Sequence, residues 1–77
     1  MPRYKVDGQL LARVNNNFVY HAPKDDQPDR YVVIRDKGKE LAMTICENTP
    51  QSREQSVALT QLEDVIMWAN AAIARNE

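Results

Sequence analysis

The fold is decided by residues 52–77, SREQSVALTQLEDVIMWANAAIARNE, which read as one long helix running to Glu77. One apolar stripe in this stretch advances by steps of three, four, three and four residues, the spacing of a single helix face. Its members are Leu59, Leu62, Ile66, Ala69 and Ile73.

Two start signals precede this helix. Thr49 can cap it with Pro50 in the first helical position. Alternatively, Ser52 and Gln55 can form a capping box in a slightly later register. We predict a helix over residues 50–76.

A second apolar stripe with the same spacing predicts another helix over residues 28–47. Its members are Tyr31, Ile34, Gly38, Leu41 and Ile45. Gly38 disfavours a helix by about 1 kcal/mol relative to Ala, and residues 36–39 could instead turn a β-hairpin. We favour the helix because it explains the spacing and lets another group approach closely at Gly38. Two stripes joined by a short connection predict an antiparallel helical hairpin.

The N-terminal segment, residues 1–22, is read in two ways. Residues 9–14 would form a short helix after Asp7 and Gly8, ending in the run of three Asn residues at 15–17. The alternative is an extended segment, a β-hairpin of residues 4–6 and 18–20. We favour the helix. In the connector that follows, Asp25 or Asp26 is available as a cap and Pro28 suits a first helical turn.

A second apolar patch on the long helix indicates self-association. Met67, Trp68 and Ala71 lie on a side shared with Val57, away from the main stripe. A 77-residue chain has little with which to cover two apolar faces, and oligomerisation is a usual remedy at this size. The sequence therefore predicts an all-α single domain, residues 1–77, assembled into a symmetric homo-oligomer. The alternative is that the N-terminal segment covers Trp68.

Composition excludes several classes of protein. Ten Lys or Arg and eleven Asp or Glu give a formal charge of −1, without the positive field of a non-specific DNA binder. The single Cys46 cannot form an internal disulfide, which is typical of a reduced cytosolic protein. No apolar run approaches the roughly 20 residues that cross a bilayer, and no signal peptide is visible. We expect a soluble intracellular protein without DNA or membrane partners.

The residues available for catalysis are few. His21 and Cys46 are each the only residue of their kind, so one chain supplies neither a zinc cluster nor a His-rich hydrolytic site. With only two glycines there is no glycine-rich phosphate loop. We predict no enzyme, no metal and no cofactor.

Anion binding is better supported by the residue pattern. Thr49, Ser52 and Arg53 accompany the free N–H groups at a helix start. The loop of residues 20–24 and the segment of residues 30–35 place cations beside aromatic rings, a pairing that suits a nucleobase and its phosphate. The alternative is that these cations bind no ligand: Arg30, Arg35 and Lys37 would form a solvated helix face, and Arg53 would support the helix cap.

The order of these features resembles a known family. The motifs are Tyr20-His21-x-Pro23-Lys24, Gln27, Arg30-Tyr31-x-x-Ile34-Arg35, Leu41-Ala42, Pro50-x-Ser52-Arg53-Glu54-x-Ser56-x-Ala58-Leu59-Thr60 and the ending Met67–Glu77. Together they resemble the phage anti-CBASS nucleotide-sponge proteins, whose helical-hairpin domain also occurs in phage anti-Thoeris sponges. The resemblance covers roughly Asn16 to the C-terminus.

This resemblance implies a homohexamer that captures cyclic oligonucleotide messengers in the cytoplasm of an infected bacterium and does not cleave them. Ligands would be cyclic dinucleotides such as 3′,3′-cyclic GMP–AMP in pockets shared by two subunits, and cyclic trinucleotides in separate pockets. A protein-binding inhibitor or oligomerisation module acting on a host protein is the alternative function. A phosphodiesterase that uses His21 is a weaker hypothesis.

Individual contacts are assigned by chemistry. Tyr20 is the first choice for stacking on a base and Tyr31 the second. The candidates for phosphate contact in the dinucleotide pocket are Lys24, Arg35 and Lys37. Arg53, with Thr49 and Ser52, is the candidate for the trinucleotide pocket, and Met67, Trp68 and Ala71 are assigned to the oligomer interface.

Overall fold

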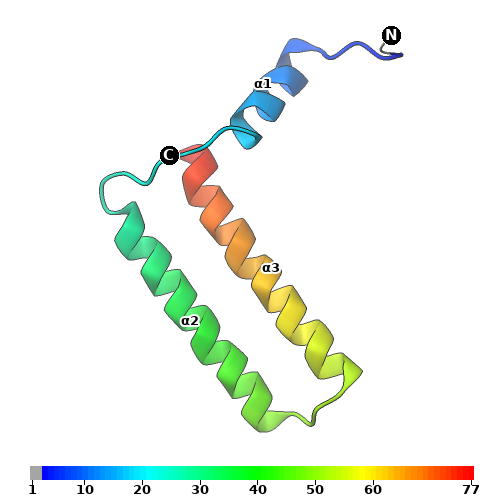
Figure 1. Ribbon diagram of the computed structural model, residues 1–77, viewed down its shortest axis with the longest axis vertical. Coiled ribbons are helices and arrows are strands. Elements are labelled where there is room, and N and C mark those ends of the chain that lie inside the picture. The colour runs from blue at the N-terminus through cyan, green and yellow to red at the C-terminus, as the bar shows by residue number, and fades with distance from the viewer. Residues whose placement is uncertain (1–2) are drawn as a thin grey trace.

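The computed structural model describes residues 3–77 and contains three helices and no strand in that range. Helix α1 spans Gly8–Asn17, α2 spans Gln27–Asn48 and α3 spans Arg53–Asn76. Helices α2 and α3 run antiparallel as a hairpin, and α1 projects from its open end, where the C-terminus also lies (Figure 1). The all-helical prediction is confirmed, and the alternative β-hairpins at residues 4–20 and 31–46 are wrong.

Helix α1 is longer than the segment of residues 9–14 predicted from the sequence. It begins at a cap, because the Asp7 carboxylate accepts a hydrogen bond of 2.7 Å from the Leu10 N–H. It continues through the Asn run, which does not form a turn, until the Phe18 N–H donates to the Val14 carbonyl at 3.0 Å. The Asn16 amide donates outward to the Arg75 carbonyl, so it does not compete with its own helix.

The long helices differ from their predicted bounds at the turn. Helix α2 exceeds residues 28–47 by one residue at each end and carries Pro28 in its first turn, as expected. Helix α3 begins three residues after the expected position 50, because the later start signal prevails. The Ser52 hydroxyl caps α3 by accepting from the Gln55 N–H at 3.1 Å. Thr49 instead ends α2, and its hydroxyl donates to the Ile45 carbonyl at 2.7 Å.

The loop before α2 also uses other caps than those expected. Asp26 occupies the capping position but makes no side-chain bond to the helix N–H groups. It forms an ion pair with Arg30 at 3.2 Å instead. Asp25 adopts a left-handed backbone with φ of 52°, a conformation that Asp tolerates better than most residues.

The two long helices approach closely at Gly38. A Cβ built on Gly38 would lie 2.7 Å from Ile66 Cδ1 and 2.9 Å from Ile66 Cγ1, which is too close for carbon atoms. Gly38 is buried and α2 continues through it, so the missing side chain makes room for Ile66. The neighbouring Leu41, which was expected in the stripe, is 48% exposed, and Ala42 is the less exposed of the two.

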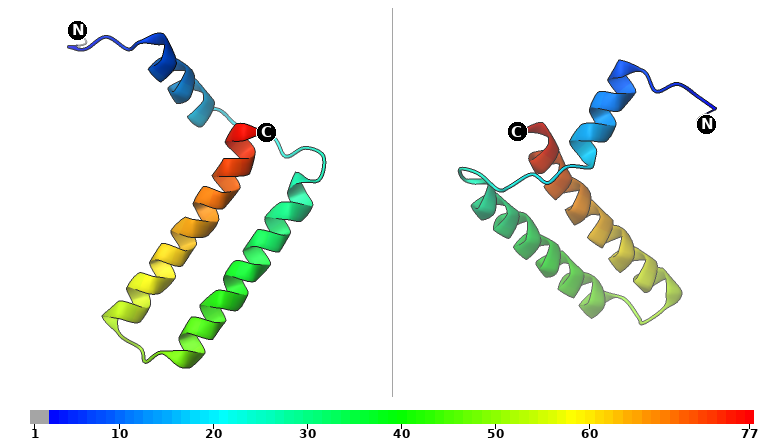
Figure 2. Two further views of the ribbon diagram at one scale, coloured as in Figure 1. Left: turned by 180° about the vertical axis from the view of Figure 1, so that it is seen from behind. Right: turned by 45° about the horizontal axis from the view of Figure 1, so that its top comes forward.

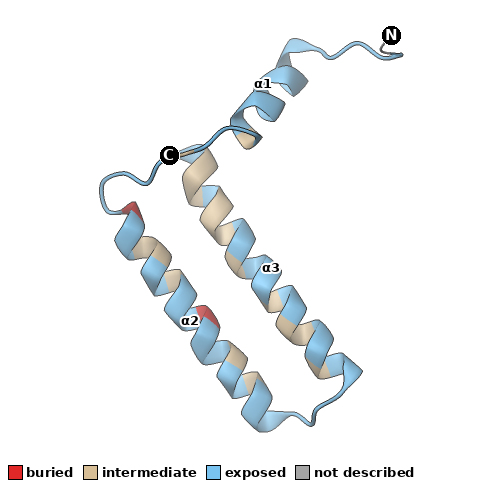
Figure 3. Ribbon diagram, viewed as in Figure 1, coloured by how far each residue is buried: buried red, intermediate tan, exposed pale blue. Residues whose placement is uncertain are grey.

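The hairpin does not enclose a core. Among residues 3–77 no apolar side chain is buried, and the molecule measures 51 × 37 × 14 Å (Figure 3). The thin dimension is close to that of a single layer of helices. Helix α1 projects from the open end of the hairpin and does not lie along the length of α2 or α3 (Figures 1 and 2). The alternative in which the N-terminal segment covers Trp68 is therefore wrong, since Trp68 is 66% exposed.

None of the helices formed by residues 3–77 is long and apolar enough to cross a membrane.

Candidate functional site

A polar groove of about 500 Å³ lies at the open end of the hairpin, between the loop of residues 18–26 and the C-terminal turn of α3. Its lining includes Tyr20, His21, Lys24, Gln27, Arg75 and Glu77. Tyr20 is 82% exposed, so its ring is free to meet a ligand. Two residues predicted from the sequence, Tyr20 and Lys24, are thus brought to one site.

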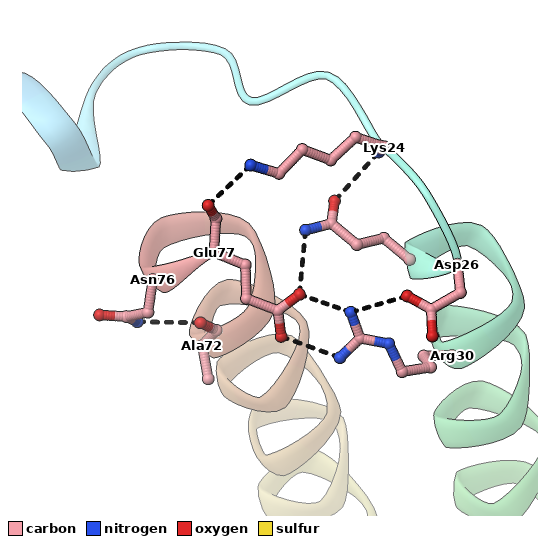
Figure 4. A network of polar contacts seen from close by, with 7 residues as sticks. Lys24, Asp26, Arg30, Ala72, Asn76 and Glu77 are labelled. Atoms are coloured by element: carbon pink, nitrogen blue, oxygen red, sulfur yellow. Dashed lines mark hydrogen bonds and ion pairs between the residues drawn. The ribbon is translucent and has the colours of Figure 1, made fainter.

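Glu77 is the centre of a network of polar contacts beside this groove (Figure 4). Both terminal nitrogens of Arg30 donate to its carboxylate, with Arg30 Nη1 at 2.8 Å from Glu77 Oε2. The hydrogen bonds from Arg30, followed by one from Gln27, lower the pKa of Glu77 from its ordinary value of 4.5 to about 2. The same pairing raises the pKa of Arg30. Glu77 therefore remains a carboxylate, and Arg30 a cation, throughout the physiological range of pH.

Lys24 contributes to this network through both its main chain and its side chain. Its N–H donates to Gln27 Oε1 at 3.1 Å, and its Nζ donates to the Glu77 main-chain oxygen at 2.7 Å. The ammonium group is thereby held over the end of α3, at the edge of the groove. A phosphate that entered the groove would find this cation already placed.

Three predicted residues on α2 do not join this site within one chain. Tyr31 is half-buried on α2. Arg35 lines a different groove of about 450 Å³ between α2 and α3, whose wall is largely apolar and includes Ile66 and Met43. Lys37 is exposed and pairs with Glu40 at 3.3 Å.

The residues expected to form a second pocket lie at the opposite end of the hairpin. The hydroxyls of Thr49 and Ser52 are both engaged locally, since Thr49 Oγ1 also accepts from Gln55 Nε2 at 2.9 Å and Ser52 Oγ donates to the Pro50 carbonyl at 3.1 Å. Arg53 follows Ser52 and lines a shallow surface groove with Ser56 and Thr60. The three residues are neighbours, but the two hydroxyls stabilise the turn in this structure.

The residues assigned to the oligomer interface form an exposed apolar patch on α3. Met67 is 65% exposed, and Trp68 is 66% exposed. Ala71 is half-buried. The Arg75 guanidinium lies 5.8 Å from the centre of the Trp68 ring, a cation–π distance. Because Arg75 also lines the polar groove, the patch and the groove meet at the end of α3.

Sequence reasoning missed two residues of the network as site residues. Gln27 appeared only within the family motifs, and Glu77 only within the closing motif and as the end of the long helix. Their bonds to residues about 50 positions away leave no local pattern. The one visible signal was the spacing of Asp26 and Arg30, which allows an ion pair on one helix face.

Among residues 3–77 no group of three or more His, Cys, Asp or Glu side chains could hold a metal ion.

Comparison with known families identifies the chain. Residues 11–74 match the family described as the Acb2/Tad1 hairpin domain. No curated protein and no solved structure matches the chain. Since the match spans most of its length, the chain belongs to this family, which is the anti-CBASS and anti-Thoeris sponge family that the sequence motifs resemble. Membership supports a general role as a phage cyclic-nucleotide sponge, a binding protein and not a known type of enzyme.

Proposed function

We propose that this member of the Acb2/Tad1 hairpin family is an immune-evasion protein that sequesters cyclic di- and trinucleotide messengers without cleaving them. By holding the messenger in the cytoplasm of the infected bacterium, it keeps the CBASS effector inactive. The observation that carries this proposal is the polar groove, where the exposed ring of Tyr20 and the cation of Lys24 lie together.

The chemistry of this groove suits a cyclic dinucleotide such as 3′,3′-cyclic GMP–AMP. An aromatic ring stacks on any base, and a fixed ammonium group pairs with a phosphate. A volume of about 500 Å³ lies within the usual range for small-molecule sites. Tyr20 remains 82% exposed in one chain, and in this proposal a second subunit covers the ligand and brings Tyr31, Arg35 and Lys37 toward it.

The same argument supports an oligomer, which we propose to be a homohexamer. With no buried apolar side chain in residues 3–77, the isolated protomer gains little from the hydrophobic effect. A patch such as Met67, Trp68 and Ala71 marks an interaction surface. Its occupant in this proposal is a second copy of the chain, and prior assembly would form rigid pockets before the ligand arrives.

A cyclic trinucleotide would bind separately, at the turn end of the hairpin. Arg53 supplies the cation there, and Thr49 and Ser52 would contact the ligand after exchanging their local hydrogen bonds. Both hydroxyls are engaged within the turn, just as the Lys24 ammonium is engaged with Glu77 at the open end, so ligand binding would exchange existing contacts at either site.

A sponge acts through affinity and slow release, because it must lower the free messenger below the affinity of the effector. Calorimetric titration with a panel of cyclic di- and trinucleotides tests the proposal. We expect submicromolar binding of at least one cyclic dinucleotide. If none of the panel binds, the exposed patch at Met67 and Trp68 would favour the second function, an inhibitor that docks on a host protein.

A further inference from the structure

The loop that carries Tyr20 and Lys24 is tied to the end of α3 at two points. At the first, the Asn16 side chain donates to the Arg75 carbonyl at 3.0 Å, and a ring nitrogen of His21 lies 2.7 Å from the Asn16 carbonyl. At the second, Gln27 and Glu77 join the other end of the loop to α3. The ligand-facing loop is thus fastened on both sides of its exposed residues.

At the second point, the side-chain amide of Gln27 links Lys24 to Glu77, and we call this link the amide relay. Gln27 is 4% exposed and is the one buried polar side chain among residues 3–77. Its Nε2 donates to Glu77 Oε1 at 3.2 Å, while its Oε1 accepts from the Lys24 N–H at 3.1 Å. A side-chain amide supplies a donor and an acceptor together, which a carboxylate or a hydrocarbon of the same length does not.

The relay also closes the turn that orients Lys24. The Gln27 N–H donates back to the Lys24 carbonyl at 2.9 Å, so two hydrogen bonds in opposite directions join these residues. Between them, Asp25 holds its left-handed conformation. Loss or displacement of the Gln27 side-chain oxygen would remove one of the two bonds and leave the Lys24 main chain held by the other alone.

We propose that Gln27 and Glu77 are positioning residues for ligand capture, which hold Tyr20 and Lys24 in place before the ligand arrives. This inference rests on the proposed function, since it concerns the same groove. Without the two residues, binding must order both side chains and the loop at the moment of capture. The free-energy cost of ordering these side chains during binding corresponds to about ten-fold weaker binding.

The test compares four variants of the full chain: Gln27→Glu, Glu77→Gln, the double variant with both changes, and Glu47→Gln. The single change Gln27→Glu keeps an acceptor for the Lys24 N–H but loses the donor to Glu77, and the repulsion between the two carboxylates should draw the new side chain away from Lys24. Glu77→Gln removes the charge that Arg30 pairs with. The double variant restores the net charge and an amide–carboxylate pair. Glu47 is exposed near the opposite end of α2, so Glu47→Gln is matched to Glu77→Gln in charge.

Two measurements are made on each variant: the Kd for 3′,3′-cyclic GMP–AMP and the hydrogen-exchange rate of the Lys24 amide without ligand. We expect each single variant to bind about ten-fold more weakly and to exchange the Lys24 amide faster, and Glu77→Gln also to melt at a lower temperature because it loses its ion pair with Arg30. The double variant should recover part of both losses, and Glu47→Gln should match the parent protein. All titrations are made well below the lowest melting temperature of the set, so that a loss of stability alone does not weaken binding.

Equal affinity in the parent protein and both single variants would overturn the inference, whatever the exchange rates. Weaker binding with an unchanged Lys24 amide would also overturn it, because the loop would not have been released. If the parent protein binds no cyclic nucleotide, the proposed function fails and positioning for capture fails with it. The exchange rates would still report whether the amide relay holds the loop.

Discussion

The two ends of the hairpin are held together by different kinds of contact. At the open end, the hydrogen bonds of Glu77 reach residues 47 to 53 positions earlier in the chain. At the turn end, the bonds of Thr49, Ser52 and Gln55 join residues at most six positions apart. The turn is therefore stabilised by its own sequence, whereas the open end exists only when the helices are already paired. The groove that we propose to bind the ligand lies at the open end and therefore depends on the whole fold.

The largest effect is expected for Trp68→Ala, which tests whether another subunit covers the apolar patch of α3 near the open end. Trp68 is 66% exposed in one chain, so the protomer itself loses little. In an assembly that buries the ring, the change costs about 3 kcal/mol or more per subunit and breaks the oligomer. Sedimentation velocity of parent and variant checks this. An oligomer of unchanged size would show that Trp68 lies outside the interface.

Gly38→Val should destabilise the hairpin by disturbing the packing of α2 against α3 between its two ends. The new side chain would meet Ile66 at under 3 Å, and overpacking of this kind costs about 2 kcal/mol. Urea unfolding measures the loss. Gly8→Ala is the control, because a Cβ at Gly8 has open space around it. If Ile66→Ala restores stability to the Gly38→Val protein, the loss comes from the contact between these two residues. A fully stable Gly38→Val protein would show that α2 and α3 do not pack closely at Gly38.

Lys24→Ala and Arg53→Ala test whether the ends bind different ligands. We expect Lys24→Ala to weaken cyclic dinucleotide binding about ten-fold, or about 1.4 kcal/mol, with the oligomer intact. Arg35→Ala should also weaken cyclic dinucleotide binding. Arg53→Ala should weaken cyclic trinucleotide binding more than dinucleotide binding. Calorimetry with both ligand classes checks each variant, and equal losses for both classes in every variant would argue against separate sites.

Ser52→Ala tests the local character of the turn end. Loss of the cap on α3 should lower the free energy of unfolding by about 1 kcal/mol. Because the contact is local, dinucleotide affinity should not change. Urea unfolding and titration on the same sample measure both quantities. A large loss of dinucleotide binding would mean that the ends are coupled more strongly than the contacts indicate.

The smallest effect is expected on the stability of the protein when the pH is lowered. The pKa of Glu77 is lowered to about 2, so its stabilising contribution is complete above its ordinary pKa of 4.5 and is lost as pH falls toward 2. The charged groups around it are Arg30, Lys24 and Asp26. The stability difference between the parent protein and Glu77→Gln should therefore shrink as pH falls from 5 to 2. A difference that stays constant over this range would show that the Glu77 charge is not stabilising.

These two kinds of contact also explain what the sequence could predict. The stripes through Ile34 and Ile66 are local patterns, and they predicted two helices that pair. The start of α3 was misplaced because Pro50 and Ser52 both signal a beginning, and the Ser52 cap prevails only once Thr49 has ended α2. Helix α1 was too short in the prediction because an outward bond to Arg75 uses the Asn16 side chain.

The candidate site was predicted less completely than the fold. Tyr20 and Lys24 were chosen by chemistry and lie together in one groove. Their neighbour Gln27 received no role, because an amide with a partner 50 residues away has no local pattern. Arg35 lines another groove of the same chain, and a shared pocket with Lys24 would require a second subunit.

The most direct test of the sponge is capture followed by release. The protein is mixed with a slight deficit of 3′,3′-cyclic GMP–AMP, filtered to measure free ligand, then denatured so that the bound ligand can be analysed by chromatography. We predict almost no free ligand before denaturation and complete recovery of the intact cyclic dinucleotide afterwards. Recovery of a linear or cleaved nucleotide, or free ligand at the level of a protein-free control, would contradict the account.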